Sequence, residues 1–407
     1  MSDEDVSTAV SEPGEGMVNI GTAADPYFVQ AVKVVAFEPT QEQVEAKQNA
    51  EAETLTKDDF RRMLGERVFD HTTVPPRPIP ILKLGKHVIS TPGNLTNIQA
   101  PAKAGKSAVI GAIIAAIMDG NRSDADTLGF SAENEKGYGV IHFDTEQSRF
   151  DHDQLIRRAV NRVGANMVPP WFRSYCVTDI PQESRLHCLE IALADAKETF
   201  GGVFAIIIDG IADLVRDPNS PEESFAFVDM LHRDSIRYDC ATITVLHENP
   251  GSGDAGKMRG HLGSQLERKA ETPLRLAKDA TTGITTVWTD RARHCHLPKT
   301  AGLCFQWSDE AGMHVSAGSA GEIKANQRQE KFREEVERAF DGGESLSYSE
   351  FVARIMERVG IAKKTAEKRI TTYQVEGAAV KSPSGSYSLV PRLPSNPRPT
   401  LNSPSGG

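Results

Sequence analysis

The sequence predicts an α/β protein with a mostly parallel sheet that carries helices on both faces. Between about residue 83 and residue 316, short apolar segments rich in β-branched residues alternate with longer amphipathic segments. Several of the apolar segments are apolar almost throughout, which is typical of strands buried on both faces of a parallel sheet. After about residue 272, one extended segment follows another. This change indicates antiparallel hairpins at one edge of the sheet.

The elements of this core follow in order along the chain. Strands are expected in the apolar, β-branched segments 94–100, 137–146, 172–179, 203–215 and 241–248, and extended hairpin segments at 273–293 and 303–315. Helices are expected in the segments between them, at 106–120, 152–164, 183–200 and 221–238. A helix between consecutive buried strands is what a parallel connection requires.

Other segments flank this core domain, 83–316. Residues 1–55 are acidic and poor in large apolar side chains, so we expect disorder there apart from a candidate helix at 40–53. Residues 56–82 comprise a helix, with Thr56 and Asp58 suited to its start, and a proline-rich extended connector. Residues 323–390 form a second domain, and the Pro/Ser/Gly-rich tail 391–407 is expected to be disordered.

The composition is that of a soluble globular protein, with 39% hydrophobic and 25% charged residues and a net charge of −10. The sequence has no apolar run long enough to span a bilayer and no signal peptide, so we expect a cytoplasmic protein with no membrane partner. The five cysteines include no CxxC pair, which argues against a disulfide framework or a zinc site. The negative charge argues against nonspecific coating of nucleic acid.

The segment "APAKAGKS" (100–107) joins an expected strand to an expected helix, as a phosphate-binding loop does. Backbone N–H groups from Lys103 to Ser107 would face a phosphate, Lys106 would reach the β- and γ-phosphates, and the Ser107 hydroxyl would ligate Mg²⁺. The expected cofactors are ATP and Mg²⁺. The expected cradle is Ala100, Pro101, Ala102, Lys103, Ala104, Gly105, Lys106, Ser107 and Ala108.

The first position of this loop departs from the usual G-x-x-x-x-G-K-[ST] pattern, because Ala100 stands where the first glycine belongs. Alanine is costly there only if the residue must adopt a positive φ. Gly105 is intact. We therefore expect a functional loop, against the alternative of a surface loop with a chance GKS sequence.

Three further strand ends carry polar side chains. The apolar strand "FAIIID" ends in Asp209, as a Walker B strand does, and Asp209 would hold Mg²⁺ through water; otherwise it is a core strand that happens to end at an acid. The strand "VIHFDTE" ends near Asp144 and Glu146. Glu146 is the first candidate to polarise the attacking water, and Asp144 is the second. His247 ends a later strand and would sense the γ-phosphate, or simply cap the strand.

This order of motifs resembles the RecA-type ATPase core, and is most similar to the RepA-like AAA ATPases, a family of hexameric plasmid replication helicases and their phage and mobile-element relatives. The resemblance covers about 83–316 and includes "HENPGSGDAGKMRGHLGSQLERKAE" at 247–271. It implies sites between subunits of a homo-oligomer of about six chains. It also implies that the Gly-rich loop 249–261, with Lys257 and Arg259, binds single-stranded DNA; the alternative is a disordered surface loop.

The segment "WTDRARHC" (288–295) resembles the late strand that carries a Lys-x-Arg pair in hexameric RecA-type helicases. The resemblance implies that Arg291 and Arg293 reach a neighbouring subunit's site and stabilise charge on the γ-phosphate. Here the first position is Arg and the following "HCHLPK" lacks the family's Asn-Gly turn. A solvated strand edge is the alternative.

The C-terminal domain has the order of a winged helix-turn-helix: three helices and a hairpin at "VKSPSGSYSLV". Its basic residues are clustered on the expected recognition helix and would contact duplex DNA: Lys363, Lys364, Lys368 and Arg369. Winged helices also serve as protein-interaction modules, and the acidic residues nearby allow that alternative.

The leading hypothesis is an ATP-hydrolysing DNA motor or loader, with possible helicase activity, in replication of a plasmid, phage or mobile element. A second hypothesis is an ATP-switched DNA-binding regulator or recombination mediator that does not translocate. A third is a DNA-binding adaptor with a vestigial loop. The presence of Lys106, Ser107, Glu146 and Asp209 counts against the third.

Overall fold

The computed structural model describes residues 17–19, 28–30, 56–248, 260–289, 291–343 and 345–391. The chain divides into two units, residues 1–76 and residues 77–407. Among the residues described, none of the helices is long and apolar enough to cross a membrane.

The first unit contains two short strands and a helix within its described parts. β1 (Met17–Asn19) and β2 (Phe28–Gln30) form an antiparallel pair. α2 (Lys57–Gly65) begins at a capping box, in which the side chains of Thr56 and Asp59 each accept a hydrogen bond from the other residue's backbone N–H. Asp59, rather than Asp58, closes the box because it is the third helical residue, whose side chain reaches back. The candidate helix at 40–53 lies outside the described residues.

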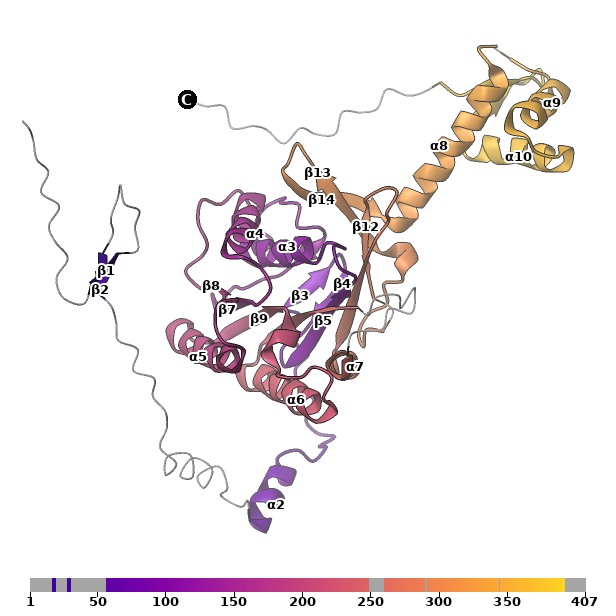
Figure 1. Ribbon diagram of the computed structural model, residues 1–407. Coiled ribbons are helices and arrows are strands. Elements are labelled where there is room, and N and C mark those ends of the chain that lie inside the picture. The colour runs from indigo at the N-terminus through magenta and orange to yellow at the C-terminus, as the bar shows by residue number, and fades with distance from the viewer. Residues whose placement is uncertain are drawn as a thin grey trace, which may run out of the picture. The chain divides into compact units, whose positions relative to one another are not determined.

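A nine-stranded sheet is the centre of the second unit (Figure 1). Six neighbouring strands are parallel, in the spatial order β11 (Thr272–Lys278), β5 (Asn94–Ala100), β10 (Ala241–His247), β9 (Val203–Asp209), β7 (Gly139–Asp144) and β8 (Phe172–Cys176). Antiparallel strands continue the sheet beyond β11, in the order β12 (Thr285–Trp288), β13 (Leu303–Ser308) and β14 (Met313–Ser319). The predicted mostly parallel sheet with antiparallel strands at one edge is confirmed.

Helices cover both faces of the parallel strands. They are α3 (Lys106–Asp119) and α4 (Arg149–Arg162) on one face, and α5 (Gln182–Phe200), α6 (Pro221–Tyr238) and α7 (Gly260–Lys269) on the other. Two short 3₁₀ helices lie in connections, η1 (Ile211–Leu214) and η3 (Lys299–Ala301). Neighbouring residues of a strand point to opposite faces. Ile206 and Ile207 of β9 therefore enter different apolar cores, which explains the continuous apolar run in this strand.

A second, three-stranded sheet was not predicted. In it β3 (Leu82–Leu84) lies between β4 (His87–Ser90) and β6 (Phe130–Ser131), and all pairs are antiparallel. Leu82 and Leu84 are buried in the core that contains α3. The end of the predicted connector is therefore a strand, and the two residues of β6 are too few to show a periodic pattern.

The C-terminal module, residues 320–391, contains three helices and a hairpin. Its elements are α8 (Ala320–Phe340), α9 (Tyr348–Val359), α10 (Lys363–Val375), β15 (Ala379–Lys381) and β16 (Tyr387–Leu389). Phe340, Phe351 and Tyr373 lie in a core of its own. α8 begins at a capping box formed by Ser319 and Glu322, directly after β14. The helix thus starts before the predicted domain boundary at 323.

Candidate functional site

The loop between β5 and α3 leaves the C-terminal edge of the parallel strands, where ligands of open α/β sheets bind. Ala100 is the last residue of β5, has no positive φ and is fully buried. It pairs with His247 of β10, and its carbonyl accepts the N–H of Glu248. Ala100 is therefore ordinary strand backbone, so a side chain at this position carries no conformational cost.

Positive φ angles occur later in the loop. Lys103 has a φ of 62° and Gly105, the N-cap of α3, has a φ of 96°. A Cβ at Gly105 would lie 3.0 Å from the ring of Phe305. The backbone of this loop thus requires glycine at 105 and not at 100.

Lys106 is the first residue of α3, and its side chain is largely buried. Its ammonium Nζ lies 3.1 Å from Nδ1 of His247. Burial lowers the pKa of Lys106, while the negative charges of Glu146 and Asp209 oppose this shift. A buried lysine among carboxylates is suited to holding an anion, because its charge is not dispersed by water.

His247 connects Lys106 to Glu146. A lysine ammonium can only donate hydrogen bonds, so Nδ1 of His247 must accept. In the neutral ring the proton is then on Nε2, which lies 3.5 Å from a carboxylate oxygen of Glu146. Lys106, His247 and Glu146, all predicted from the sequence, therefore form one chain of contacts. They come from the start of α3, the end of β10 and the turn after β7.

Asp209 ends β9, which is separated from β5 by β10. Its carboxylate is buried, and Gln147 Nε2 donates to it over 3.3 Å. Burial and the nearby charges of Asp144 and Glu146 raise the pKa of Asp209 to about 7. The ionised form of Asp209 is therefore disfavoured by burial and by the neighbouring negative charges. A divalent cation bound beside it would stabilise the ionised form.

Asp144, the second candidate for the base, has a structural role. One of its carboxylate oxygens accepts the backbone N–H groups of Glu146 and Gln147, at 3.0 Å each, and the other lies 3.0 Å from Nδ1 of His152. Burial alone would raise the pKa of Asp144, but the hydrogen bonds from His152 and the two N–H groups hold it below its usual value. Asp144 therefore fixes the turn that presents Glu146.

A cavity of about 320 Å³ lies in front of these groups. Its lining joins the loop and the start of α3 to the acidic strand ends: Lys103, Gly105, Lys106, Ser107, Ala108, Glu146, Gln147, Asp209, Lys278, Thr285 and His314. The last three were missed by sequence analysis: Lys278 ends the parallel strand β11, Thr285 begins the antiparallel β12, and His314 lies near the start of β14. Their link to the loop depends on sheet order, which no local pattern reveals.

The residues of this cavity fit a nucleoside triphosphate with Mg²⁺. Gly105 allows the left-handed turn into α3, Lys106 supplies a positive charge, and α3 presents its N-terminus. Ser107 and Asp209 supply oxygen atoms, the ligands that Mg²⁺ prefers. Two more carboxylates, Asp144 and Glu146, add negative charge beside them.

Arg291 and Arg293 lie away from this cavity. β12 ends at Trp288, so the two arginines follow the strand instead of lying on it. The N–H of Arg293 bonds to the carbonyl of Glu271, and the N–H of Glu271 bonds to the carbonyl of Leu95, near the start of β5. Five residues of strand, about 16 Å, separate Leu95 from the loop at the other end of β5. Neither arginine is placed to reach the cavity of its own chain.

The predicted DNA-binding residues have different surroundings. Lys257 and Arg259 lie outside the described residues. Lys363, Lys364 and Lys368 are exposed at the start and middle of α10. Arg369 forms an ion pair with the buried Glu335 instead, and Tyr373 also donates to that carboxylate.

Matches to known proteins are found among solved structures. No protein-family model matches the chain, and no curated protein matches it. Among solved structures, the crystal structure of the RadB recombinase is similar over 55% of this chain and 90% of that chain, with 16% sequence identity and a TM-score of 0.36. At this identity and TM-score, the likeness carries no argument about activity or partners.

Proposed function

We propose that this chain is an ATPase of the RecA type that acts on DNA, as a motor or loader in replication of a plasmid, phage or mobile element. The observation that carries the hydrolytic part is the cavity in which Lys106 and Ser107 face Glu146 and Asp209. These groups come from α3, from the turn after β7 and from the end of β9, so the sheet itself holds them together.

In this proposal each side chain has a distinct task. Lys106 balances the charge of the phosphates, and Ser107 and Asp209 hold Mg²⁺. Glu146 orients a water molecule and accepts its proton, a role supported by its position on a turn fixed by Asp144. Bound MgATP would supply the phosphoanhydride bond that is cleaved.

His247 is proposed to link the cavity to DNA. It contacts Lys106 and lies beside Glu146, and it ends β10 just before the glycine-rich segment that carries Lys257 and Arg259. A change at the phosphates would change the hydrogen bond that His247 makes. That change would be passed to the following segment, whose cations would meet the phosphates of single-stranded DNA.

The C-terminal module is proposed to be a winged helix that contacts duplex DNA. The support is the order of its elements and the three exposed lysines of α10, Lys363, Lys364 and Lys368. Because Arg369 is paired with Glu335, we assign it to the stability of the module instead.

The experiment that tests the proposal is steady-state ATP turnover by the full chain, with and without single-stranded DNA. Strong stimulation by DNA is expected for a motor or loader. Turnover that ignores DNA would instead favour an ATP-switched regulator or recombination mediator. Absence of turnover would contradict the ATPase proposal and favour an adaptor.

A pair of variants checks that any turnover belongs to this cavity. Lys106→Ala is expected to abolish nucleotide binding, measured by equilibrium titration with a fluorescent ATP analogue. Lys324→Ala removes an exposed lysine on α8 and is the matched control, with affinity unchanged. Equal affinity in the two variants would place the nucleotide elsewhere.

A further inference from the structure

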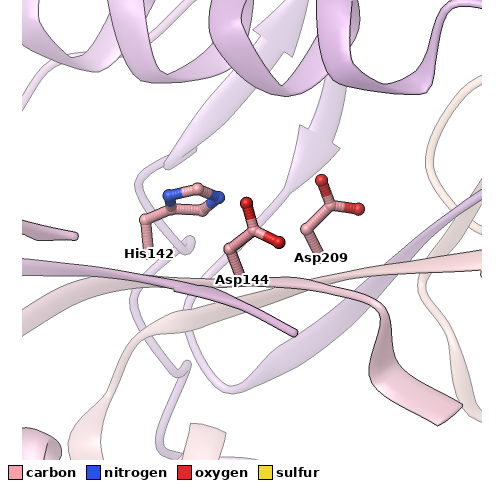
Figure 2. Close-up of side chains that lie close together, drawn as sticks. All are labelled: His142, Asp144 and Asp209. Carbon is pink, nitrogen blue, oxygen red and sulfur yellow. The ribbon is translucent and has the colours of Figure 1, made fainter. Parts of the chain in front are cut away.

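Three metal-ligating side chains meet behind the proposed nucleotide cavity. His142 and Asp144 lie two residues apart on β7 and therefore on the same face of the sheet, and Asp209 ends the neighbouring β9. One ligand atom from each side chain lies within 4.8 Å of the others, and all three residues are buried (Figure 2). His142 has no part in the proposed hydrolysis.

A chain of hydrogen bonds sets the proton positions around this group. Nδ1 of His152 lies 3.0 Å from Asp144, its Nε2 lies 2.9 Å from the Ser174 hydroxyl, and that hydroxyl lies 2.8 Å from Nδ1 of His142. The ionised Asp144 only accepts, so His152 donates from Nδ1; in the neutral ring its Nε2 is then the acceptor. Ser174 must then donate to His152 and accept from Nδ1–H of His142.

The remaining nitrogen of His142, Nε2, therefore carries a lone pair. It is fully buried and has no hydrogen-bond partner. Burial lowers the pKa of His142 to about 4, so the ring is neutral at neutral pH. Figure 2 shows one ring nitrogen turned toward the carboxylates of Asp144 and Asp209. A lone pair that faces two carboxylates needs a positive charge between them.

We propose that His142 Nε2, Asp144 and Asp209 bind a divalent transition-metal ion such as Zn²⁺. Asp209 would be shared with the proposed Mg²⁺ site, and the new site would add His142 and Asp144 on the far side. The ion would join β7 to β9 directly beneath the turn that carries Glu146. It would also offset the negative charge that these carboxylates bring together.

The donor set favours this class of ion over Mg²⁺. Imidazole nitrogen suits Zn²⁺ and neighbouring transition ions, whereas Mg²⁺ is bound through oxygen. The bond from Nδ1 of His142 to Ser174 is the second interaction that orients a metal-binding histidine. Three ligand atoms each about 2.1 Å from one tetrahedral ion lie about 3.4 Å apart, so any pair near the 4.8 Å limit of this group has to move closer by about 1.4 Å when the ion binds.

The test is Co²⁺ binding by the full chain after chelator treatment, without nucleotide and with excess Mg²⁺. We expect one equivalent of Co²⁺ to bind, with visible absorption bands, and Zn²⁺ to displace it. His142→Phe removes the nitrogen but keeps a ring, and is expected to abolish the bands. Ser174→Ala is expected to weaken binding about 10-fold, because the ring loses its orienting partner. His232→Phe, on α6, is the matched control and should bind as the unaltered chain does.

Two results would overturn the proposal: no uptake of Co²⁺ by the unaltered chain, or uptake that both His142→Phe and Ser174→Ala leave unchanged. Lys106→Ala separates this inference from the proposed ATPase function. It should lose nucleotide binding and keep Co²⁺ binding.

Discussion

Gly105 is the residue at which the backbone between β5 and α3 excludes a side chain. Its φ of 96° and the 3.0 Å approach of the Phe305 ring leave no room for a Cβ. Ala100, five residues earlier, is the last residue of the strand β5 and accepts a small side chain. The departure from the usual motif therefore lies at its least demanding position.

A substitution at Gly105 should weaken nucleotide binding, whereas one at Ala100 should leave it unchanged. Gly105→Ala forces an L-residue into a left-handed conformation, at a cost of about 1–2 kcal/mol before any clash with Phe305. It should weaken binding of a fluorescent ATP analogue at least 10-fold. Ala100→Gly should leave the affinity unchanged and lower the unfolding free energy by about 1 kcal/mol. Loss of affinity in Ala100→Gly alone would contradict this assignment.

The roles of Glu146 and Asp144 can be distinguished because substitution of Glu146 should change ATP turnover, whereas substitution of Asp144 should change thermal stability. Glu146→Gln should keep nucleotide affinity and lower turnover by 100-fold or more, because a general base is lost. Asp144→Asn should lower the melting temperature, because its Oδ1 can still accept the two N–H groups but its amide nitrogen cannot accept the hydrogen bond from His152. Turnover and thermal unfolding of both variants give the answer. Full turnover in Glu146→Gln would move the base to another residue.

At the scale of elements, the strands that the sequence predicted best are those buried on both faces. The continuous apolar runs of β9 and β10 identified them without reference to the rest of the chain. β10 ends at the predicted His247, and the FAIIID motif located Asp209. The predicted strand segment 203–215 was too long, because the apolar residues after Asp209 form the 3₁₀ helix η1. β6 has only two residues and β3 three, so neither carries enough pattern to be recognised.

Contacts between elements were beyond the reach of sequence patterns. The bonds from His142 through Ser174 to His152 join β7, β8 and α4, and they depend on the register His142↔Ser174. Arg369 was predicted to face DNA because it follows three lysines. It instead turns toward Glu335 on α8, a residue 34 positions earlier. A basic cluster on one helix does not reveal which of its members packs inward.

The pair of Arg369 and Glu335 predicts how the C-terminal module responds to acid. Glu335 is 2% exposed. Its burial favours the neutral form, yet hydrogen bonds from Arg369 and Tyr373 lower its pKa. Because the pKa is lower in the folded state, the stabilisation is present above the pKa of the unfolded chain and is lost as pH falls below it. Hydrogen exchange of α8 and α10 amides should therefore accelerate, relative to the core, as pH falls below the ordinary glutamate value of 4.5 and not between pH 7 and that value.

The matched variant for this prediction is Glu335→Gln, which keeps the shape of the side chain. It should destabilise the module by about 1–3 kcal/mol at pH 7, because Arg369 loses its charged partner. The variant should also lose the acid response. An acid response of the same size in Glu335→Gln would assign it to another carboxylate.

At the scale of the whole molecule, the two DNA-binding surfaces that we propose belong to separate parts of the chain. The module begins with α8 directly after β14, so removal of residues 320–407 leaves every strand of the main sheet intact. This truncation should keep ATP turnover and weaken duplex binding, measured by fluorescence anisotropy. Lys363→Ala/Lys364→Ala/Lys368→Ala in the full chain should reproduce the weaker binding and reduce its salt dependence. Unchanged duplex affinity in both would remove DNA from the role of the module.

The position of Arg291 and Arg293 makes an active site between subunits a testable property. They lie near the start of β5, while the loop of the same chain lies at its end. If they serve a neighbour, each working interface needs Lys106 from one chain and both arginines from the next. A Lys106→Ala chain and an Arg291→Ala/Arg293→Ala chain should each be inactive alone. In an equal mixture about a quarter of the interfaces combine an intact loop with intact arginines, so about a quarter of the unaltered turnover should return. A mixture that stays inactive would show that the arginines do not complete a neighbour's site, and Lys278, which lines the cavity of its own chain, would become the first cation to test for that role.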